Sequence, residues 1–463
     1  MSAVVSRPVI RPMGGRRSVA TRRRDDLLGR VHLAVRLARR TLKAAVAAEE
    51  EGLARSGPEA SPRPAALVLG KVVGEAAMLL RTTAPLRGED ETLDVEARLL
   101  AVQLVAQARG ARVRERLCND AGRALEHASA HLFLGDAGYP DEAFDRLLAD
   151  ILDGEDACGP ERLPNHQLEC AWLDQIRRGR VEVEPIDEEL LVATCIGWPL
   201  DVLGCSTLDL YMFTHVVMYA SDMGRRTVPL PRPAEDILAE AEAGLAAALD
   251  ADNFDLAAEL LWTWPMLHQR WSAAAVFAFE LLTQVQDEHA FLPGPDYARW
   301  AERAGGGLSH EDVVLRTSYH ATLVMGMLCA VALQTDVEPH LEAPRGAPRE
   351  APRGTRLAAR FAGMQPVPSD DLLDRLPAKP FVPRWQRDFA SLDERERASL
   401  TSLCFSVWFR RAASANDIPR LREALAATLE HDDCDGPSAH QALRRLQRIT
   451  AIGRLQAEAM ASR

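Results

Sequence analysis

The chain has very little lysine and few aromatic residues. Three of its 463 residues are lysines, and the other 52 of its 55 basic residues are arginines. Catalysis through a lysine Schiff base is therefore disfavoured, because few lysines exist that the fold could bury. Aromatic residues make up 5% of the chain, no apolar run reaches the roughly 18 residues that cross a bilayer, and no secretory apolar core begins it. We therefore expect a cytoplasmic protein without a transmembrane segment.

The sequence also lacks the short motifs of several common enzyme classes. It has eight cysteines but no C-x-x-C pair, which argues against a disulfide framework or a thiolate zinc site and favours reduced core thiols. No P-loop, strand-linked G-x-G-x-x-G or G-x-S-x-G motif occurs. Nucleotide hydrolysis, Rossmann redox chemistry and α/β-hydrolase chemistry are disfavoured, and the sequence identifies no cofactor.

Charge is distributed unevenly along the chain. The net charge is −12, yet residues 1–43 carry +10, so the remaining residues carry −22. Residues 1–24 have no apolar period and are expected to form a disordered basic tail. Residues 25–54 are expected to form a basic amphipathic helix, which would bind an anionic membrane or nucleic acid, or dock on the acidic body of its own chain. We favour docking, because no aromatic residue anchors the apolar face and the acidic body repels nucleic acid.

Helical periodicity dominates the rest of the sequence. Apolar residues recur at spacings of three and four, glycine or proline marks the breaks, and no segment has a convincing two-residue period. The expected fold is all-α: a helical body over 63–334, a Pro/Arg-rich insert over 335–385, and C-terminal helices over 386–463 that close the body. The expected helices cover approximately residues 65–82, 92–109, 112–134, 140–153, 165–178, 187–204, 206–223, 233–249, 252–264, 268–287, 309–334, 391–412, 416–430 and 437–460.

The most informative predicted helix covers residues 208–224, LDLYMFTHVVMYASDMG. A helix that is apolar on every side is buried, so the polar groups along one face of this helix must have partners or line a cavity. His215 is predicted to be a general base or a metal ligand, Asp222 an orienting or ligating carboxylate, and Tyr219 a proton donor. Tyr211, on the same face, is predicted to contact substrate. The alternative interpretation is a hydrogen-bonded polar seam between helices.

A second candidate pair lies at the start of the segment NHQLECAWLDQIRRG. His166 and Glu169 are three residues apart and share a helix face. The helix dipole disfavours an imidazolium at this end, so the neutral ring of His166 would accept a proton or bind a metal. A local His/Glu cap pair is the alternative.

Three further segments contain candidate site residues of four types: tryptophan, aspartate, tyrosine and histidine. In ELLWTWPMLHQRW, Trp262 and Trp264 are predicted to wall an apolar substrate pocket, with core packing as the alternative. In LTQVQDEHAFLPGP, Asp287 is predicted to contact substrate. In TSYHATLVMGML, Tyr319 is predicted to bind substrate and His320 to act in catalysis, although a histidine on an apolar face is usually a satisfied core residue.

The predicted helix hairpins resemble the repeated units of α/α-toroid proteins. The resemblance lies in connections that contain Gln, Asp, His and Trp, notably QDEHAFLPGP (286–295) and TSYHATLVMGML (317–328). These include terpenoid cyclases, protein prenyltransferase β chains and six-hairpin glycosidases. The chain as a whole resembles an uncharacterised helical family of high-GC bacteria placed among these toroids. The resemblance covers roughly residues 63–334 and implies an inner ring of helices around a central cavity. The chain lacks the D-D-x-x-D and D-x-D-D signatures of the cyclases and the zinc-binding set of the prenyltransferases.

These observations predict an enzyme of bacterial specialised metabolism. An apolar, Trp-lined cavity would bring His215, Asp222, His166 and Glu169 together for acid–base or metal-assisted chemistry on an apolar or peptide-like substrate. The alternative is a non-catalytic helical scaffold that binds a peptide or partner protein in the same groove, because no complete catalytic motif is present. A nucleic-acid-binding regulator is a third and weaker hypothesis.

Overall fold

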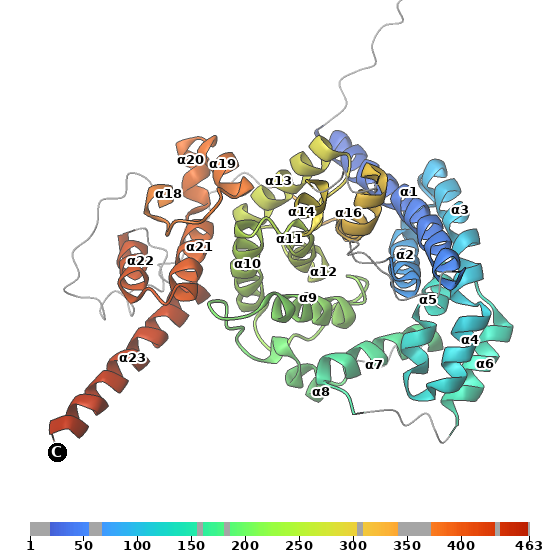
Figure 1. Cartoon of the computed structure of the whole chain (residues 1–463), viewed down its shortest axis with the longest axis horizontal. Coiled ribbons are helices and arrows are strands. Elements are labelled where there is room, and N and C mark those ends of the chain that lie inside the picture. The colour runs from blue at the N-terminus through green and yellow to red at the C-terminus, as the bar shows by residue number, and fades with distance from the viewer. Residues whose placement is uncertain are drawn as a thin grey trace, which may run out of the picture.

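The computed structural model describes residues 19–54, 67–154, 161–179, 186–302, 309–340, 372–430 and 436–461. These residues form helices joined by short connections, and no strand occurs among them (Figure 1). The predicted all-α fold class is confirmed. Most of the predicted basic tail and of the Pro/Arg-rich insert lies outside the described residues.

Many of the described helices match the ranges expected from periodicity. The expected helices over 112–134, 252–264 and 391–412 are each two helices, and the expected helix over 187–204 ends at Ala193. In chain order the described helices are α1 (Val19–Ala54), α2 (Leu69–Thr83), α3 (Glu91–Ala108), α4 (Ala111–Asn119), α5 (Ala124–Asp136), α6 (Glu142–Leu152), α7 (Pro164–Arg178), α8 (Glu188–Ala193), α9 (Thr207–Ser221), α10 (Ala234–Asp250), α11 (Phe254–Leu261), α12 (Thr263–Met266), α13 (Ala273–His289), α14 (Tyr297–Ala301), α15 (His310–Thr317), α16 (Tyr319–Gln334), α18 (Leu372–Arg375), α19 (Arg384–Ala390), α20 (Glu394–Ser399), α21 (Thr401–Ser414), α22 (Ile418–Glu430) and α23 (Pro437–Ala461).

The expected helix over 309–334 is in fact two helices, α15 and α16, which meet at Ser318 with a bend of 57°. A loop from elsewhere in the chain causes the break. The backbone N–H of Gly294 donates to the Ser318 hydroxyl (3.2 Å), and a Cβ at Gly294 would lie 1.9 Å from the Thr317 carbonyl oxygen. A contact between segments so far apart in the sequence leaves no mark on the local apolar period, and so the prediction missed it.

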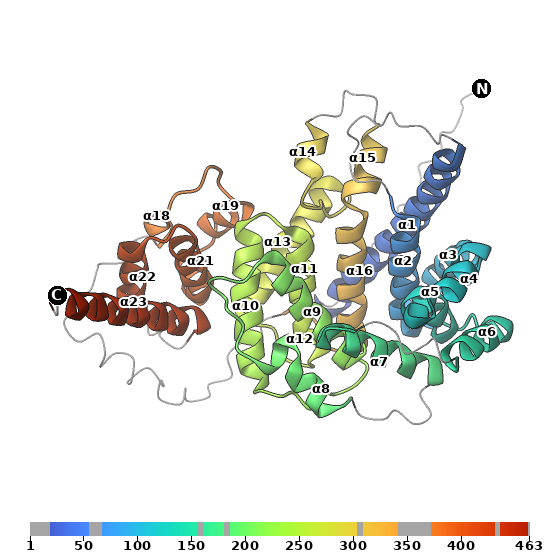
Figure 2. The ribbon, with the colours of Figure 1, turned by 60° about the horizontal axis from the view of Figure 1, so that its bottom comes forward.

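Six helices contact one another in a closed cycle. Along this cycle α2 contacts α5, α5 contacts α7, α7 contacts α9, α9 contacts α11, α11 contacts α16, and α16 returns to α2. We call these six helices the helix cycle. The helices that alternate with them in the sequence contact one or two members: α1 contacts α2 and α16, α3 contacts α2 and α5, and α10 and α13 both contact α11. Figure 2 shows α2, α11 and α16 side by side.

The members of the helix cycle run in the same direction. Near their N-termini, Asp255 of α11 lies close to His320 of α16. Near their C-termini, Arg81 of α2 pairs with Asp136 of α5 (2.8 Å), and the Gln334 side chain of α16 donates to a backbone carbonyl at the end of α2 (2.6 Å). The cycle therefore has an N-terminal end and a C-terminal end, each closed by its own polar groups.

Helix α1 docks on its own chain, as the sequence favoured. Its apolar stripe, which includes Leu27, Val31 and Ala34, is fully buried. At Gly326 of α16 the two helices approach so closely that a Cβ would lie 2.2 Å from the Cβ of Ala34. Its arginines pair with acidic residues of other helices, among them Arg23 with Glu280, Arg36 with Glu96 and Arg40 with Glu311.

The C-terminal helices α18–α23 lie to one side, against α10 rather than on the helix cycle (Figures 1 and 2). Asp250, the last residue of α10, is the polar centre of this junction. Its carboxylate accepts hydrogen bonds from Arg411 (2.6 Å) and from the Trp385 indole (3.2 Å), and it pairs with Lys379 (3.1 Å).

Among the residues that the structure describes, no single helix is long and apolar enough to cross a bilayer, whereas the bent pair α15 and α16 meets the length and composition together.

Candidate functional site

A group of carboxylates and imidazoles lies between the members of the helix cycle, and we call it the carboxylate–histidine cluster. Five of the six helices contribute to it. Its members are Glu75 of α2, Glu169 of α7, His215 of α9, Asp255 and Glu259 of α11, and His320 of α16.

His320 connects three of the carboxylates. Its Nδ1 lies 3.1 Å from Oε1 of Glu75, and its Nε2 lies 3.6 Å from Oε1 of Glu259 and 3.7 Å from Oδ1 of Asp255. The distances from Nε2 exceed an ordinary hydrogen bond. One ring nitrogen is therefore paired, while the other faces two carboxylate oxygens across a gap.

The two carboxylates of α11 are each held by a hydroxyl group. The Tyr211 hydroxyl donates to Oδ2 of Asp255 (2.7 Å), and the Thr214 hydroxyl donates to Oε2 of Glu259 (2.7 Å). Because each hydroxyl occupies the oxygen that points away from His320, the other oxygen of each carboxylate is oriented toward the imidazole. Both donors come from α9, the neighbour of α11 in the helix cycle.

The other side of the cluster is centred on His215. Its Nε2 lies 3.5 Å from Oε2 of Glu259, and its ring lies 6.0 Å from that of Tyr219, one helical turn further along α9. Burial and the neighbouring Glu169 carboxylate raise the pKa of Tyr219 well above its usual value, and the same carboxylate helps to raise that of His215. Tyr219, Glu169 and His215 thus form a short polar chain that ends at Glu259.

The local sequence explains how α11 presents two acidic groups to the interior. In the segment FDLAAELL, Asp255 and Glu259 are four residues apart and lie on one face, and every residue of the helix is buried. The Asn253 side chain caps the first turn by accepting from the N–H of Leu256. The apolar positions pack against α10 and α16, which leaves the two carboxylates to find polar partners inside the protein.

Burial and mutual charge shift the pKa values of the cluster in opposite directions. Burial alone would lower the pKa of both histidines, but the carboxylates outweigh it: Glu259 and Glu169 raise the pKa of His215, and Glu75 and Asp255 raise that of His320. Burial alone would raise the pKa of Glu259, yet the two imidazoles hold it well below its usual value.

Two other carboxyl groups resist ionisation. Burial, reinforced by repulsion from Glu259 and Glu75, raises the pKa of Asp255 despite the nearby His320. Burial and repulsion from Glu126 of α5 raise the pKa of Glu169. The cluster has four carboxyl groups and only two imidazoles, so two of its acids lose their protons less readily than usual.

The histidines of the cluster keep accessible surface, whereas the carboxylates of α11 do not. The side chains of His215 and His320 are 32% and 28% exposed, compared with 1% for Glu259 and 7% for Asp255. Both histidines make their polar contacts with other members of the helix cycle. Their accessible surfaces therefore lie on the sides of the helices that face the other members of the cycle. A molecule that reached the cluster would meet the two imidazoles first.

The structure brings together several of the residues that the sequence singled out. His215, Glu169 and His320 are members of the cluster, and the three predicted tyrosines contact it. Tyr211 donates to Asp255, whereas Tyr219 and Tyr319 lie near enough to Glu169 and Glu75 for each carboxylate to raise the pKa of its tyrosine.

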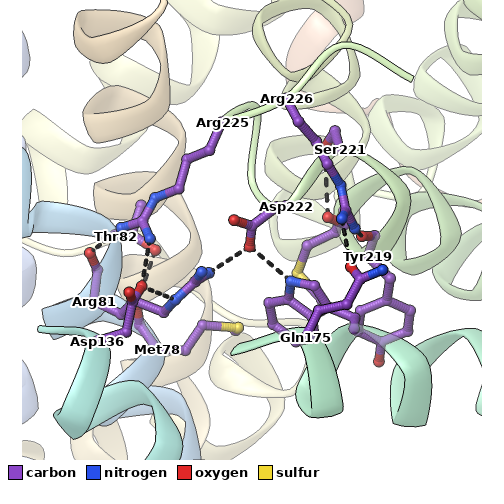
Figure 3. A network of polar contacts seen from close by, with 12 residues as sticks. Met78, Arg81, Thr82, Asp136, Gln175, Tyr219, Ser221, Asp222, Arg225 and Arg226 are labelled. Atoms are coloured by element: carbon purple, nitrogen blue, oxygen red, sulfur yellow. Dashed lines mark hydrogen bonds and ion pairs between the residues drawn. The ribbon is translucent and has the colours of Figure 1, made fainter. Parts of the chain in front are cut away.

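Asp222 lies in a different network, at the C-terminal end of the helix cycle (Figure 3). It caps α9 with a left-handed backbone (φ 51°), and its Oδ1 accepts from the Trp172 indole (2.7 Å) and pairs with the buried Arg81 (2.7 Å). Arg81 in turn pairs with Asp136, which also accepts from Arg225 (2.7 Å). The predicted convergence of Asp222 with His215 is not found, because the αL cap turns Asp222 toward α2 and α7.

The remaining predicted residues lie apart from the cluster. His166 is exposed in the first turn of α7, where it favours the charged form of Glu169. Trp262 and Trp264 are each 1% exposed and belong to the core, and the ring of Trp264 stacks on that of Trp271. Asp287 accepts from Arg30 of α1 (3.1 Å).

The sequence prediction missed Glu75, Asp255 and Glu259. A signal was present, since each acid interrupts an otherwise apolar helical stretch, VVGEAAMLL or FDLAAELL. An acid at such a position must be buried with a partner. The partners come from α9 and α16, more than 40 residues away, so the local pattern could not identify them.

Three members of the cluster are placed to bind a single cation. Asp255, Glu259 and His320 each offer one ligand atom, and these atoms lie within 4.8 Å of one another. No disulfide joins the cysteines that the structure describes, and none of them belongs to this group. The arrangement suits proton transfer through the imidazoles and cation binding between the carboxylates.

Comparisons with known proteins place the chain in a family. Neither the curated proteins nor the solved structures contain a match to it. A family model described as "Domain of unknown function (DUF6895)" matches residues 22–330. The matched region begins in α1, ends in α16 and contains every residue of the carboxylate–histidine cluster. Because the match covers more than half of the chain, the protein belongs to the DUF6895 family.

Proposed function

We propose that the protein is an enzyme with an α/α-toroid fold and that the carboxylate–histidine cluster is its acid–base site. The helix cycle is the inner ring of the toroid, and the alternating helices α1, α3, α6, α8, α10 and α13 form its outer layer. The closed cycle of contacts and the common direction of the six helices support this arrangement. The family region, which extends from α1 into α16, coincides with the two layers.

The observation that carries the proposal is the environment of His215. This imidazole lies between Glu259 and the Glu169–Tyr219 pair, yet 32% of its side chain is accessible. A purely structural polar seam would have no need to expose the imidazole. A general acid or base must contact both its substrate and a group that orients it, and His215 has both features.

The residues on either side of His215 have distinct roles in this proposal. Glu259 orients the imidazole from Nε2, and Glu169 stabilises its protonated form from the other side. Tyr219 lies beside Glu169. His215 is the group that exchanges a proton with substrate, and Glu169 and Tyr219 are positioning residues.

Of the two substrate classes that the sequence predicted, a peptide-like substrate fits the site better. A purely apolar molecule would remove water from several carboxylates without offering hydrogen bonds in exchange, which is costly. The amide groups of a peptide can replace that water. Trp262 and Trp264, which were expected to provide an apolar wall, are buried in the core instead.

The test is conversion of a defined panel of compounds followed by mass spectrometry. The panel contains short peptides, oligosaccharides and prenyl diphosphates, and the proteins are the wild type, His215→Gln and Glu311→Gln. Glu311 pairs with Arg40 on the surface and serves as the matched control. We expect conversion of a peptide, an unchanged rate in the control and a loss of about 10²–10⁴-fold in His215→Gln, the range for a general acid or base.

Two results would contradict the proposal. Equal conversion by the wild type and by folded His215→Gln would remove His215 from the chemistry. Conversion of no peptide by the wild type would favour a non-catalytic scaffold.

A further inference from the structure

We infer that Asp255, Glu259 and His320 bind a divalent transition-metal cation, Zn²⁺ or Mn²⁺. This inference deepens the proposed function, because it assigns a metal to the half of the cluster opposite His215. It rests on the ligand geometry, on the groups that orient the ligands and on an unsatisfied buried oxygen.

The ligand geometry matches a metal better than direct hydrogen bonds. Nε2 of His320 lies 3.6 Å from Oε1 of Glu259 and 3.7 Å from Oδ1 of Asp255. Two ligand atoms about 2.0–2.2 Å from a tetrahedral zinc ion lie roughly 3.3–3.6 Å apart. The two distances from His320 therefore differ from this range by at most a few tenths of an ångström, and all three atoms lie within 4.8 Å of one another.

Each of the three ligands is oriented by a group behind it. A histidine that binds metal through one nitrogen almost always offers the other to a carboxylate, carbonyl or water, and Glu75 lies 3.1 Å from Nδ1 of His320. The Tyr211 hydroxyl holds Oδ2 of Asp255, and Oε2 of Glu259 accepts from a threonine hydroxyl of α9, both at 2.7 Å. In both acids, the oxygen that does not accept from a hydroxyl is the one that faces His320.

A buried polar atom in this group has no hydrogen-bond partner. The Asp255 side chain is 7% exposed, and its Oδ1, which faces His320, accepts no hydrogen bond. An unsatisfied buried carboxylate oxygen is costly unless a cation or water satisfies it. Three carboxylates surround His320, and the one lysine near them, Lys71, is 3.6 Å from Glu75 and largely exposed. A divalent cation at this position would favour the ionised form of all three carboxyl groups.

The chemical type of the ligands selects the class of metal. One imidazole and two carboxylates suit Zn²⁺, Mn²⁺ or Fe²⁺, whereas Ca²⁺ takes six to eight oxygen ligands and Mg²⁺ prefers oxygens in an octahedron. When bound, the metal would supply a Lewis acid to polarise a substrate oxygen. His215, on the other side of Glu259, would exchange protons with the same substrate.

Calorimetric titration of the full-length chain, first stripped with EDTA, tests the site. Wild type, Asp255→Asn, His320→Gln and Glu311→Gln are titrated with ZnCl₂, MnCl₂, MgCl₂ and CaCl₂. Glu311→Gln is the matched control, because it removes a surface carboxylate that lies outside the cluster. We expect one Zn²⁺ or Mn²⁺ per wild-type chain, weaker Mg²⁺ and Ca²⁺ binding, a loss of at least about 100-fold in both ligand variants, and an unchanged affinity in the control.

Absorption of the wild-type chain loaded with Co²⁺ provides a second measurement that does not depend on how the variants fold. The visible bands of a site of low coordination number support the inference, and the spectrum of hydrated Co²⁺ contradicts it. Failure of the wild type to bind Zn²⁺ or Mn²⁺, or equal affinity in folded Asp255→Asn and His320→Gln, would also overturn it.

The outcomes separate this inference from the proposed function. Metal binding that depends on Asp255 and His320, without conversion of any peptide, would keep the metal site and overturn the proposed function. Conversion that depends on His215 in a chain that binds no metal would do the reverse.

Discussion

Nδ1 of His320 lies 3.1 Å from Oε1 of Glu75, and this pairing turns the opposite ring nitrogen toward Asp255 and Glu259. Glu75 also neighbours Tyr319, the residue before His320, and burial together with this carboxylate raises the pKa of Tyr319. A single carboxylate from α2 thus sets the orientation of an imidazole on α16. The two residues belong to different members of the helix cycle and are 245 positions apart in the sequence.

Replacement of Glu75 by alanine is expected to weaken zinc binding by about 10–100-fold, because the imidazole loses the group that orients it. Glu75→Gln should lose less zinc affinity than Glu75→Ala, because its amide oxygen can still accept from Nδ1 of His320. Competition with a fluorescent zinc chelator measures both affinities. An unchanged affinity in Glu75→Ala would show that the pairing does not orient His320 for metal.

Replacement of Asp222 by alanine is expected to affect stability rather than the cluster. It would remove one of the two carboxylates that pair with Arg81, which is 1% exposed, and leave Asp136 at 2.8 Å as the other. Loss of one hydrogen bond to a charged group costs about 1.5–3 kcal/mol. Urea denaturation measures the loss, and zinc titration of the folded variant should give the wild-type affinity. Unchanged stability with lost activity would instead restore the catalytic role that the sequence suggested.

Two glycine substitutions test the packing of α1 on α16. Gly326→Ala should destabilise the protein by about 1–3 kcal/mol, because the new Cβ would lie 2.2 Å from that of Ala34 and force the helices apart. Gly74→Ala, in α2, meets nothing within 4 Å and should stabilise it by about 0.4–1 kcal/mol. Thermal unfolding compares the two, and equal effects would argue against the close crossing.

Acid should destabilise the contacts of His131 in α5. Arg109 donates to Nδ1 of this ring (3.0 Å), so the other nitrogen carries the proton and donates to Asp145 (2.8 Å). Burial, reinforced by the Arg109 charge, lowers the pKa of His131 below its usual 6.5 despite Asp145. The unfolded chain therefore binds the proton more readily, and stability falls as the pH drops below about 6.5 toward the folded-state pKa.

The melting temperature between pH 7.5 and pH 5 measures this effect. His131→Gln, which cannot take up the proton, should have a smaller acid-dependent decrease than the wild type. Parallel pH profiles for the two proteins would contradict the proposed linkage.

Much of the fold could be predicted from the sequence. The apolar stripe of α1 and its lack of aromatic residues favoured docking on the chain itself, and Leu27, Val31 and Ala34 are indeed buried. The helical breaks that depend on glycine or proline were located to within a few residues. The break at Ser318 was missed, because a loop around Gly294 imposes it from outside the helix.

The candidate site was only half visible in the sequence. His215 and His320 were recognised as polar rings on apolar helices, and both belong to the cluster. Asp222 was assigned by helical spacing alone, yet an αL cap takes it out of the helical register. Asp255 and Glu259 were not predicted, because their partners are on other helices. Only the closed helix cycle brings these acids and their partners together.

Anomalous diffraction from crystals soaked in ZnCl₂ or MnCl₂ tests the metal site most directly. We expect one strong peak about 2.0–2.2 Å from Oδ1 of Asp255, Oε1 of Glu259 and Nε2 of His320. The peak should be absent in Asp255→Asn crystals soaked in the same way. Wild-type crystals with no peak at this position would contradict the assignment of a metal centre to the carboxylate–histidine cluster.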